Sequence, residues 1–470
     1  MFMRFHVPCA RVILLLVLSQ IASAASLRPE SALPLELSLQ DACHISLVKN
    51  KTLKSAMNSV TRARMQREDR QADFYWHIRP DGELGTADGD AYAGMGVLAE
   101  RKLGWGPEVH IKPYADRSPT HYESGISAGL QVPLLRGRGR PIVMDGVITA
   151  EFSETLTGLS LQRARSSVLL GVIETYYKAR LQESLLELYD THYRFIEAQV
   201  EKVILKESMG LATSMDVYRA HQRLNDDADR IAEVKNRLAG YVDQLKELLS
   251  MDLDCPVCLT PVPECSFILP EAAAAVKTAL ANRIDVIIAE RSVKEAARQA
   301  RLARHTLLPQ LDMNVNYRQY GTGESMSEAS QLDEHAWRIS LGSTTDFFRR
   351  AERSAYRQEL INLRNAELSR ETVRQQVIKE VNARLESIKK NQEQMVLRRQ
   401  AESVAAGKKE LSQIKYMQGL SDNADTMDAE VESLQAQESR MTAEVDYALG
   451  IYQLQAAMGI LESFVMGEAP

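Results

Sequence analysis

The segment Ser208-Met-Gly-Leu-Ala-Thr-Ser214 is the one clear interruption of a stretch, residues 142–255, that contains no proline. A second proline-free stretch, residues 310–469, is interrupted in the same manner by Gln418-Gly-Leu-Ser-Asp-Asn423. Because proline breaks the interior of a helix, each stretch can hold very long helices. One interruption per stretch predicts two antiparallel helical hairpins, whose outgoing arms of about 70 residues would extend roughly 100 Å at 1.5 Å per residue.

Apolar residues within both stretches recur at steps of three and four, with occasional slips. The positions are Leu169, Ile173, Tyr176, Leu181, Leu185, Leu188 and Phe195 in the first stretch, and Val373, Val377, Val381, Leu385 and Ile388 in the second. The remaining positions are dense in Glu, Lys, Arg and Gln. This spacing is typical of a coiled-coil-like seam between long amphipathic helices.

The two hairpins belong to two copies of one larger unit. Leu47, Ala56, Val60 and Ala63 match Leu280, Ala289, Val293 and Ala296, and Gly210, Leu211, Asp216 and Ala220 match Gly419, Leu420, Asp425 and Ala429. Coiled coils resemble one another by chance, but agreement at both hairpin tips favours a duplication. We expect a first repeat over 25–255, a linker rich in Cys and Pro over 256–270, and a second repeat over 271–470.

Segments with a period of two lie between the helices. Residues 122–135, 310–318 and 337–342 each place apolar side chains on one face and polar ones on the other. A fourth strand is expected within 80–99, where Gly82, Gly85, Gly94 and Gly96 obscure the pattern. The alternation is typical of membrane-barrel strands and equally of a soluble sandwich. Four strands cannot close a barrel, so a membrane barrel would require several copies of the chain.

The N-terminus predicts export. Residues 1–24 resemble a signal peptide, with Arg4 and Arg11, an apolar run over 12–18 and a small-residue cleavage site at Ala22-Ser-Ala24. No later segment approaches 18 uninterrupted apolar residues. The formal charge of −6 gives no electrostatic reason to expect a nucleic-acid partner.

No motif of a catalytic or metal site appears in the sequence. Cys255, Cys258 and Cys265 are the one cysteine cluster, and a disulfide among them is favoured over redox or metal chemistry because no second cysteine or histidine pair accompanies them. We therefore expect neither an enzyme nor a cofactor.

Three further segments and the two Gly-Leu tips carry a likeness that runs from about Leu37 to Ser463. The segments are Ala279-Leu-Ala-Asn-Arg-Ile-Asp-Val286, Leu307-Leu-Pro-Gln-Leu311 and Gln131-Val-Pro-Leu-Leu-Arg-Gly137. In this order and spacing they resemble the TolC family of outer-membrane factors.

The resemblance implies a mainly α fold with a β part, in which three copies share a twelve-stranded barrel, four strands from each, above an α-helical periplasmic tunnel. It also implies a passive outer-membrane exit channel of a tripartite efflux or type I secretion system, in contact with outer-membrane lipid. The partners would be a periplasmic adaptor and an inner-membrane transporter or ABC exporter. A periplasmic coiled-coil adaptor or scaffold without a pore is the alternative.

The resemblance also assigns roles at the hairpin tips. Asp425 and Asp428 lie six and nine residues after Gly419, where the family has its constricting acidic pair, and Tyr416 lies where it has a latch tyrosine. Ser421 replaces an arginine of that latch, and Met215 a threonine-like partner. Gly210, Leu211, Thr213, Gly419, Leu420 and Ser421 resemble the grooves that dock the adaptor, although ordinary turn chemistry explains them too. Asp216 is expected to cap a helix with Thr213.

Overall fold

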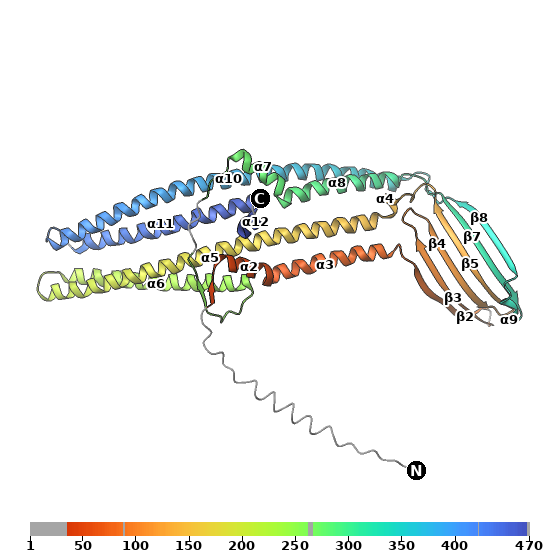
Figure 1. Cartoon of the computed structure of the whole chain (residues 1–470), viewed down its shortest axis with the longest axis horizontal. Coiled ribbons are helices and arrows are strands. Elements are labelled where there is room, and N and C mark those ends of the chain that lie inside the picture. Colours follow the sequence, from red (N-terminus) through yellow and green to blue (C-terminus); the bar gives the residue numbers. More distant parts are fainter. Residues whose placement is uncertain (1–34, 88–89, 262–266, 422, 468–470) are drawn as a thin grey trace, which may run out of the picture. The chain divides into compact units, whose positions relative to one another are not determined.

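The computed structural model describes residues 35–87, 90–261, 267–421 and 423–467 (Figure 1). The chain divides into two compact units, which are described separately. Unit 1 comprises Met1–Ser46, Val172–Cys265 and Ser412–Leu434, and unit 2 comprises Leu47–Gly171, Ser266–Leu411 and Gln435–Pro470. None of the described helices contains an apolar stretch long enough to cross a membrane.

Helix lengths agree with the duplication predicted from the sequence. Helices α2 (Leu39–Lys49) and α3 (Lys51–Ala72) contain 11 and 22 residues, as do α7 (Ala272–Asn282) and α8 (Ile284–His305). Both helices of the second pair follow their counterparts at one constant offset, which is also the offset of the matched residues in the sequence.

Two long helical hairpins follow, as predicted. Helices α5 (Asp145–Ser208) and α6 (Ser214–Leu249) contain 64 and 36 residues, and α10 (Arg350–Met417) and α11 (Asn423–Met458) contain 68 and 36. Each proline-free stretch therefore holds an outgoing helix, a short turn and a returning helix. The end of α10 follows the end of α5 at the same offset at which the start of α11 follows the start of α6.

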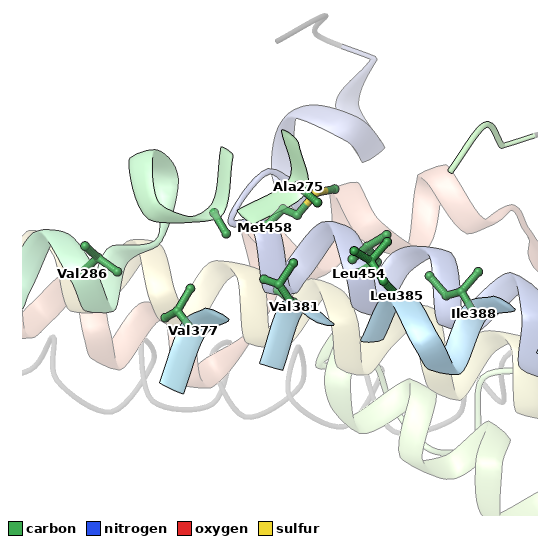
Figure 2. Packing of buried hydrophobic residues seen from close by; sticks show 10 residues of the cluster. Ala275, Val286, Val377, Val381, Leu385, Ile388, Leu454 and Met458 are labelled. Atoms are coloured by element: carbon green, nitrogen blue, oxygen red, sulfur yellow. The ribbon is translucent and has the colours of Figure 1, made fainter. Parts of the chain in front are cut away.

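The predicted seam of α10 forms a hydrophobic core within unit 2. Val377, Val381, Leu385 and Ile388 are buried on successive turns of α10, against Leu454 and Met458 of α11 and Ala275 and Ala279 of α7 (Figure 2). The four α10 residues recur at steps of three and four, so they lie on one face of the helix. Gly450 of α11 lies where a Cβ would come within 3.1 Å of Ile388, so glycine permits this close approach of two helices without crowding.

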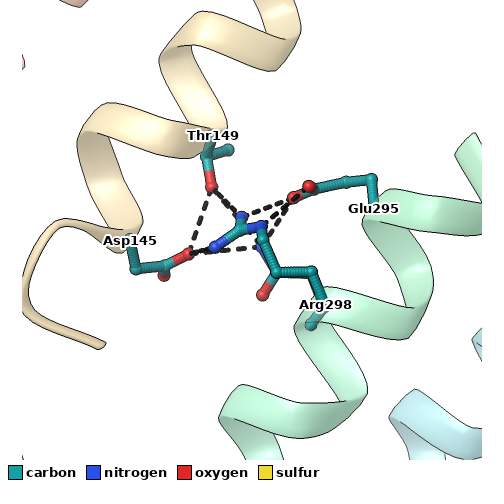
Figure 3. A network of polar contacts seen from close by, with 5 residues as sticks. Asp145, Thr149, Glu295 and Arg298 are labelled. Atoms are coloured by element: carbon teal, nitrogen blue, oxygen red, sulfur yellow. Dashed lines mark hydrogen bonds and ion pairs between the residues drawn. The ribbon is translucent and has the colours of Figure 1, made fainter. Parts of the chain in front are cut away.

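A polar network joins α8, which precedes β7, to α5, which follows β5. Arg298 of α8 bonds Asp145 and Thr149 of α5 at 2.6 and 2.8 Å, and its own neighbour Glu295 at 2.5 Å (Figure 3). Burial would raise the pKa of Glu295, but hydrogen bonds from Arg298 and Gln299 outweigh it and hold this pKa below its ordinary value. The network fixes the start of α5 beside α8.

The sheet of unit 2 differs from the prediction in its number of strands. Six antiparallel strands form it in the order β2-β3-β4-β5-β7-β8. They are β2 (His77–Ala87), β3 (Asp90–Lys102), β4 (Glu108–Arg117), β5 (Tyr122–Pro133), β7 (Asp312–Gly323) and β8 (Glu334–Gly342). The last three confirm the strands expected at 122–135, 310–318 and 337–342. The expected four strands per chain are wrong: the glycine-rich region 80–99 lies in two strands, β2 and β3, rather than one, and β4 is a further strand that was not predicted.

Short elements complete the fold. In unit 1, β1 (Leu35–Leu37) pairs in parallel with β6 (Val257–Leu259), inside the predicted linker, and Tyr176 of α5 donates to the carbonyls of Leu37 and Thr260 at 2.8 Å. The short helices are α4 (Arg140–Val143), α9 (Met326–Ala329) and α12 (Leu461–Met466).

The expected disulfide receives no support among the described residues, where Cys43, Cys255 and Cys258 are free thiols. Cys265 and the predicted signal peptide lie outside the described residues.

Candidate functional site

The six-stranded sheet has one apolar face. Directly opposed residues share a face, and one row crosses all six strands: Ile78, Ala99, Ile111, Ala128, Tyr317 and Trp337. The row beside it consists of His77, Glu100, His110, Gly129, Asn316 and Arg338. Within the described part of unit 2 the apolar face is uncovered, since Leu84, Met95 and Trp337 are 85%, 70% and 72% exposed. A large exposed apolar face marks a surface that contacts lipid or another protein.

The opposite face of the sheet holds a ladder of ion pairs. Arg79 pairs with Glu100, Lys112 with Asp81, and Arg318 with Glu123, each joining different strands. Tyr114 and Tyr92 donate to Glu123 and Glu83 at 2.7 and 2.8 Å. Charged groups that pair with one another across strands and stay accessible to water suit the lining of an aqueous passage.

Exposed aromatic side chains gather at one end of the sheet, where the strands join the helices. Tyr75 and Trp76 precede β2, Trp105 lies in the turn between β3 and β4, and Phe347 and Phe348 follow β8. Tyr and Trp concentrate at membrane–water interfaces because their apolar rings carry one polar group, and aromatic residues form the girdles of membrane barrels. The sheet thus has the apolar band and one of the aromatic girdles of a membrane wall.

The two hairpin tips of unit 1 have the same backbone design. Gly210 and Gly419 adopt φ of +74° and +72°, and the residue after each bonds back to the helix, Leu211 to the carbonyl of Lys206 and Leu420 to that of Lys415. This is the left-handed ending that glycine permits without steric cost. It leaves Leu211 and Leu420 72% and 73% exposed.

Helix α6 begins with the predicted cap. Thr213 and Asp216 form a capping box, in which the Thr213 side chain accepts from the Asp216 N–H and Asp216 accepts from the Thr213 N–H at 3.0 Å. At the second tip, Ser421 donates to Asp425 at 2.9 Å. The six predicted docking residues therefore lie in the two turns, and several of them also serve the turns themselves.

Two of the three predicted gate residues, Tyr416 and Asp428, contact the other hairpin of the same unit. Tyr416 accepts a 2.5 Å hydrogen bond from Lys206 of α5, whose ammonium group also lies 4.1 Å from the centre of the tyrosine ring. Asp428 bonds Arg223 of α6 at 3.0 Å. Met427, between the two aspartates, is buried against Ile196, Val200 and Ala220 and fixes this face of α11 on the first hairpin.

Sequence reasoning missed Lys206 and Arg223. Each contacts a residue more than 200 positions away, and sequence spacing does not tell which helices touch. The duplication carried a signal. If α6 pairs with α11, exchanging the two repeats turns the pair of Arg223 and Asp428 into a pair of Glu432 and Arg219, which also carry opposite charges.

A buried polar pair was also missed. His192 of α5 and Asp227 of α6 are bonded at 2.6 Å and are almost fully buried. The pair joins the two helices of the first hairpin inside their contact. Within the described residues, no group of three or more His, Cys, Asp or Glu side chains could hold a metal ion.

Comparison with known proteins agrees with this geometry. Solved structures with the same fold include the outer-membrane channel OprN (18% identity, TM-score 0.71, 90% of this chain and 89% of that one), CusC (15%, 0.72, 92% and 95%) and the Campylobacter jejuni CmeC outer membrane channel (16%, 0.71, 92% and 89%). No curated sequence matches the chain significantly. Residues 275–460 match the model of the outer membrane efflux protein family, and the fold of the chain is that of these solved outer-membrane channels.

Proposed function

We propose that three copies of this chain form a passive exit channel, whose sheets cross the outer membrane and whose helical hairpins extend through the periplasm. One observation carries this proposal: a single apolar face continues without a break across six antiparallel strands, while the other face is charged. A soluble sandwich would cover the apolar face with a second sheet. Nothing in the described part of unit 2 covers it.

The need for several copies follows from the edges of the sheet. Within the described residues, β2 and β8 each pair with one strand only. Unpaired backbone groups at a strand edge are not tolerated in the hydrocarbon region, so the edges must meet those of other copies. Because the six strands alternate in direction, β8 of one copy is antiparallel to β2 of the next, and the alternation continues around a ring. Three copies is the number that the likeness to the TolC family implies.

The hairpin tips are the proposed periplasmic entrance. Asp425 and Asp428 from three copies would form rings of carboxylates, which narrow a pore and favour cations. The contacts of Lys206 with Tyr416 and of Arg223 with Asp428 tie the second hairpin to the first and hold the entrance closed. They take the place of the latch that Ser421 and Met215 lack.

The proposed partners follow from the same tips. Two exposed leucines, Leu211 and Leu420, in turns of equal shape offer repeated apolar contacts to a periplasmic adaptor. An inner-membrane transporter would supply the energy. The named relatives OprN and CmeC are outer-membrane channels, and efflux is therefore the process we assign to this chain.

Cell fractionation tests the proposal against a soluble adaptor. Expressed with its own leader in a Gram-negative host, the protein should appear in outer-membrane fractions as trimers that dissociate only on heating in detergent. A soluble periplasmic monomer would disprove the channel and favour the adaptor or scaffold. A companion variant is Ile339→Asp on the apolar face of β8, which should reduce membrane insertion.

A further inference from the structure

The two repeats differ by one pair of strands. The second repeat has β7 and β8 between its helices, whereas the first has β2, β3, β4 and β5. The offset between equivalent positions of the repeats is shorter at the hairpin tips than before the strands. The shortfall equals the combined length of β2 and β3, which contain 11 and 13 residues. The β2–β3 hairpin is therefore what the first repeat has and the second lacks.

This hairpin has the length and the pattern of the other strands. The six strands contain between 9 and 13 residues, and a tilted strand needs about 9–11 residues to cross a membrane. On β2 and β3, Ile78, Leu84, Met95 and Val97 lie on the apolar face shared by all six strands. A hairpin standing outside the membrane would have no reason to keep that alternation in register with its neighbours.

Ion pairs on the polar face fix the hairpin to the rest of the sheet. Lys112 of β4 extends over β3 to reach Asp81 of β2. It can do so because β3 carries Gly96 beneath it, where a Cβ would lie 3.1 Å from the lysine side chain. Arg79 and Glu100 add a pair between β2 and β3. The glycines that obscured these strands in the sequence thus make room for the contacts that hold them in the sheet.

The aromatic residues at the end of the sheet flank this hairpin as well. Trp76 leads into β2 and Trp105 lies just after β3, while Phe347 and Phe348 mark the same end of the sheet beside β8. Exposed aromatic residues thus flank the strands at both edges of the sheet, β2 and β8, and on the same end. This places β2 and β3 at the same membrane depth as β8.

On the basis of the proposed trimeric channel, we propose that the β2–β3 hairpin is part of the membrane wall and that β2 pairs with β8 of the next copy. Each copy then contributes six strands, and three copies close a barrel of eighteen. For a strand spacing of about 4.8 Å and a tilt of about 40°, the backbone diameter is about 36 Å, compared with about 24 Å for twelve strands. The ion pairs of β2, β3 and β4 line this wider lumen.

Labelling of single cysteines tests whether the hairpin lies in the wall. In a background with the four mature cysteines replaced, Met95→Cys and Ile339→Cys on the apolar face should resist a charged maleimide in outer-membrane preparations. Leu98→Cys and Ser340→Cys on the polar face should react. Reaction of Met95→Cys while Ile339→Cys stays protected would overturn the hairpin proposal and leave the channel intact. Reaction of both would instead contradict the membrane sheet itself.

Cross-linking identifies the edge strand. Ile339→Cys is combined in turn with cysteine at each outward position of β2 (78, 80, 82 and 84), and in a matched series at each outward position of β4 (109, 111, 113 and 115). Within one copy β8 is separated from both strands by at least two others, so any disulfide joins two copies. The proposal predicts covalent dimers and trimers from the β2 series only. Products from the β4 series, or from neither series, would overturn it.

Discussion

Two side-chain contacts hold the tips of unit 1 together, and in each contact only one of the two residues could be singled out from the sequence. Tyr416 and Asp428 stand out because they fall at fixed distances from Gly419. Lys206 and Arg223 are ordinary surface residues of an amphipathic helix until α11 is packed beside α6, which depends on the burial of Met427. Sequence spacing describes one helix, whereas these contacts depend on the pairing of two.

Loss of the Lys206 contact should open the entrance. Lys206→Met keeps the length of the side chain but removes both the hydrogen bond to Tyr416 and the charge above its ring. Because a polar pair near the surface, here partly buried, contributes up to about 1 kcal/mol, the open probability should rise by up to about fivefold. Single-channel recording measures it. Lys202→Met, one turn earlier on α5 and exposed, is the control; an equal rise there would exclude a specific tie.

The pair of Arg223 and Asp428 predicts opposite changes in ion selectivity. Either Arg223→Ala or Asp428→Ala breaks the contact and should raise conductance. Arg223→Ala leaves Asp428 uncompensated and should increase cation preference, whereas Asp428→Ala, alone or with Asp425→Ala, should lower it. Reversal potentials in a salt gradient measure the preference, with Lys235→Ala on α6 as control. Selectivity that shifts in the same direction in both variants would remove Asp428 from the pore.

At the scale of single elements, the start of α6 was predictable because a capping box is local. Thr213 and Asp216 are three residues apart, and no distant contact is needed to bring them together. The hydrogen bonds from Thr213, side chain first and backbone second, hold the pKa of Asp216 below its ordinary value. A carboxyl group of this kind stabilises the fold above its unfolded-state pKa of about 3.9 and loses that contribution as the pH falls through the folded-state value.

The cap should therefore weaken in acid. Asp216→Asn should speed hydrogen exchange in the first turn of α6 at pH 7, and its difference from the parent protein should shrink below a pH of about 4. Thr213→Ala removes the hydroxyl that accepts from the Asp216 N–H and donates to the Asp216 carboxylate, so it should cost about 1 kcal/mol at pH 7 and less below a pH of about 4. Exchange corrected for intrinsic rates is the measurement. An Asp216→Asn effect that does not change with pH would contradict the capping role.

The seam of α10 was also predictable, since its apolar residues recur with the helical period. Ile388 is fully buried among Leu385, Leu454 and their neighbours. Ile388→Ala should lower the free energy of unfolding of unit 2 by about 2–5 kcal/mol, because it leaves a cavity. Ile361→Ala, exposed on the same helix, should change it by less than about 0.5 kcal/mol. Denaturant unfolding followed by circular dichroism compares them, and equal losses would contradict the packing.

The strands of the first repeat show where prediction from sequence ended. Glycine weakens a strand because it has no side chain to pack, and four glycines within 80–99 hid β2 and β3. In the sheet a neighbouring side chain occupies the space: the Tyr92 ring lies over Gly85, and His110 over Gly129. Which side chain lies over a given glycine depends on the register between the two strands, and the sequence of one strand does not reveal that register.

For the whole molecule, the duplication explains most of the architecture. Equal helix pairs, equal hairpin tips and a constant offset on each side of the strands follow from two copies of one unit. The difference lies in the strands, where the first copy contributes four and the second two. Neither copy can close a sheet, and the six strands of one chain still leave two edges, so assembly is a consequence of the fold.

Conductance of the purified protein in planar lipid bilayers tests the central claim most directly. The account predicts discrete, cation-preferring channels of low conductance in the parent protein and larger steps after Lys206→Met or Arg223→Ala. Trimers that insert into the bilayer and conduct no ions in the parent protein or in either variant would contradict it.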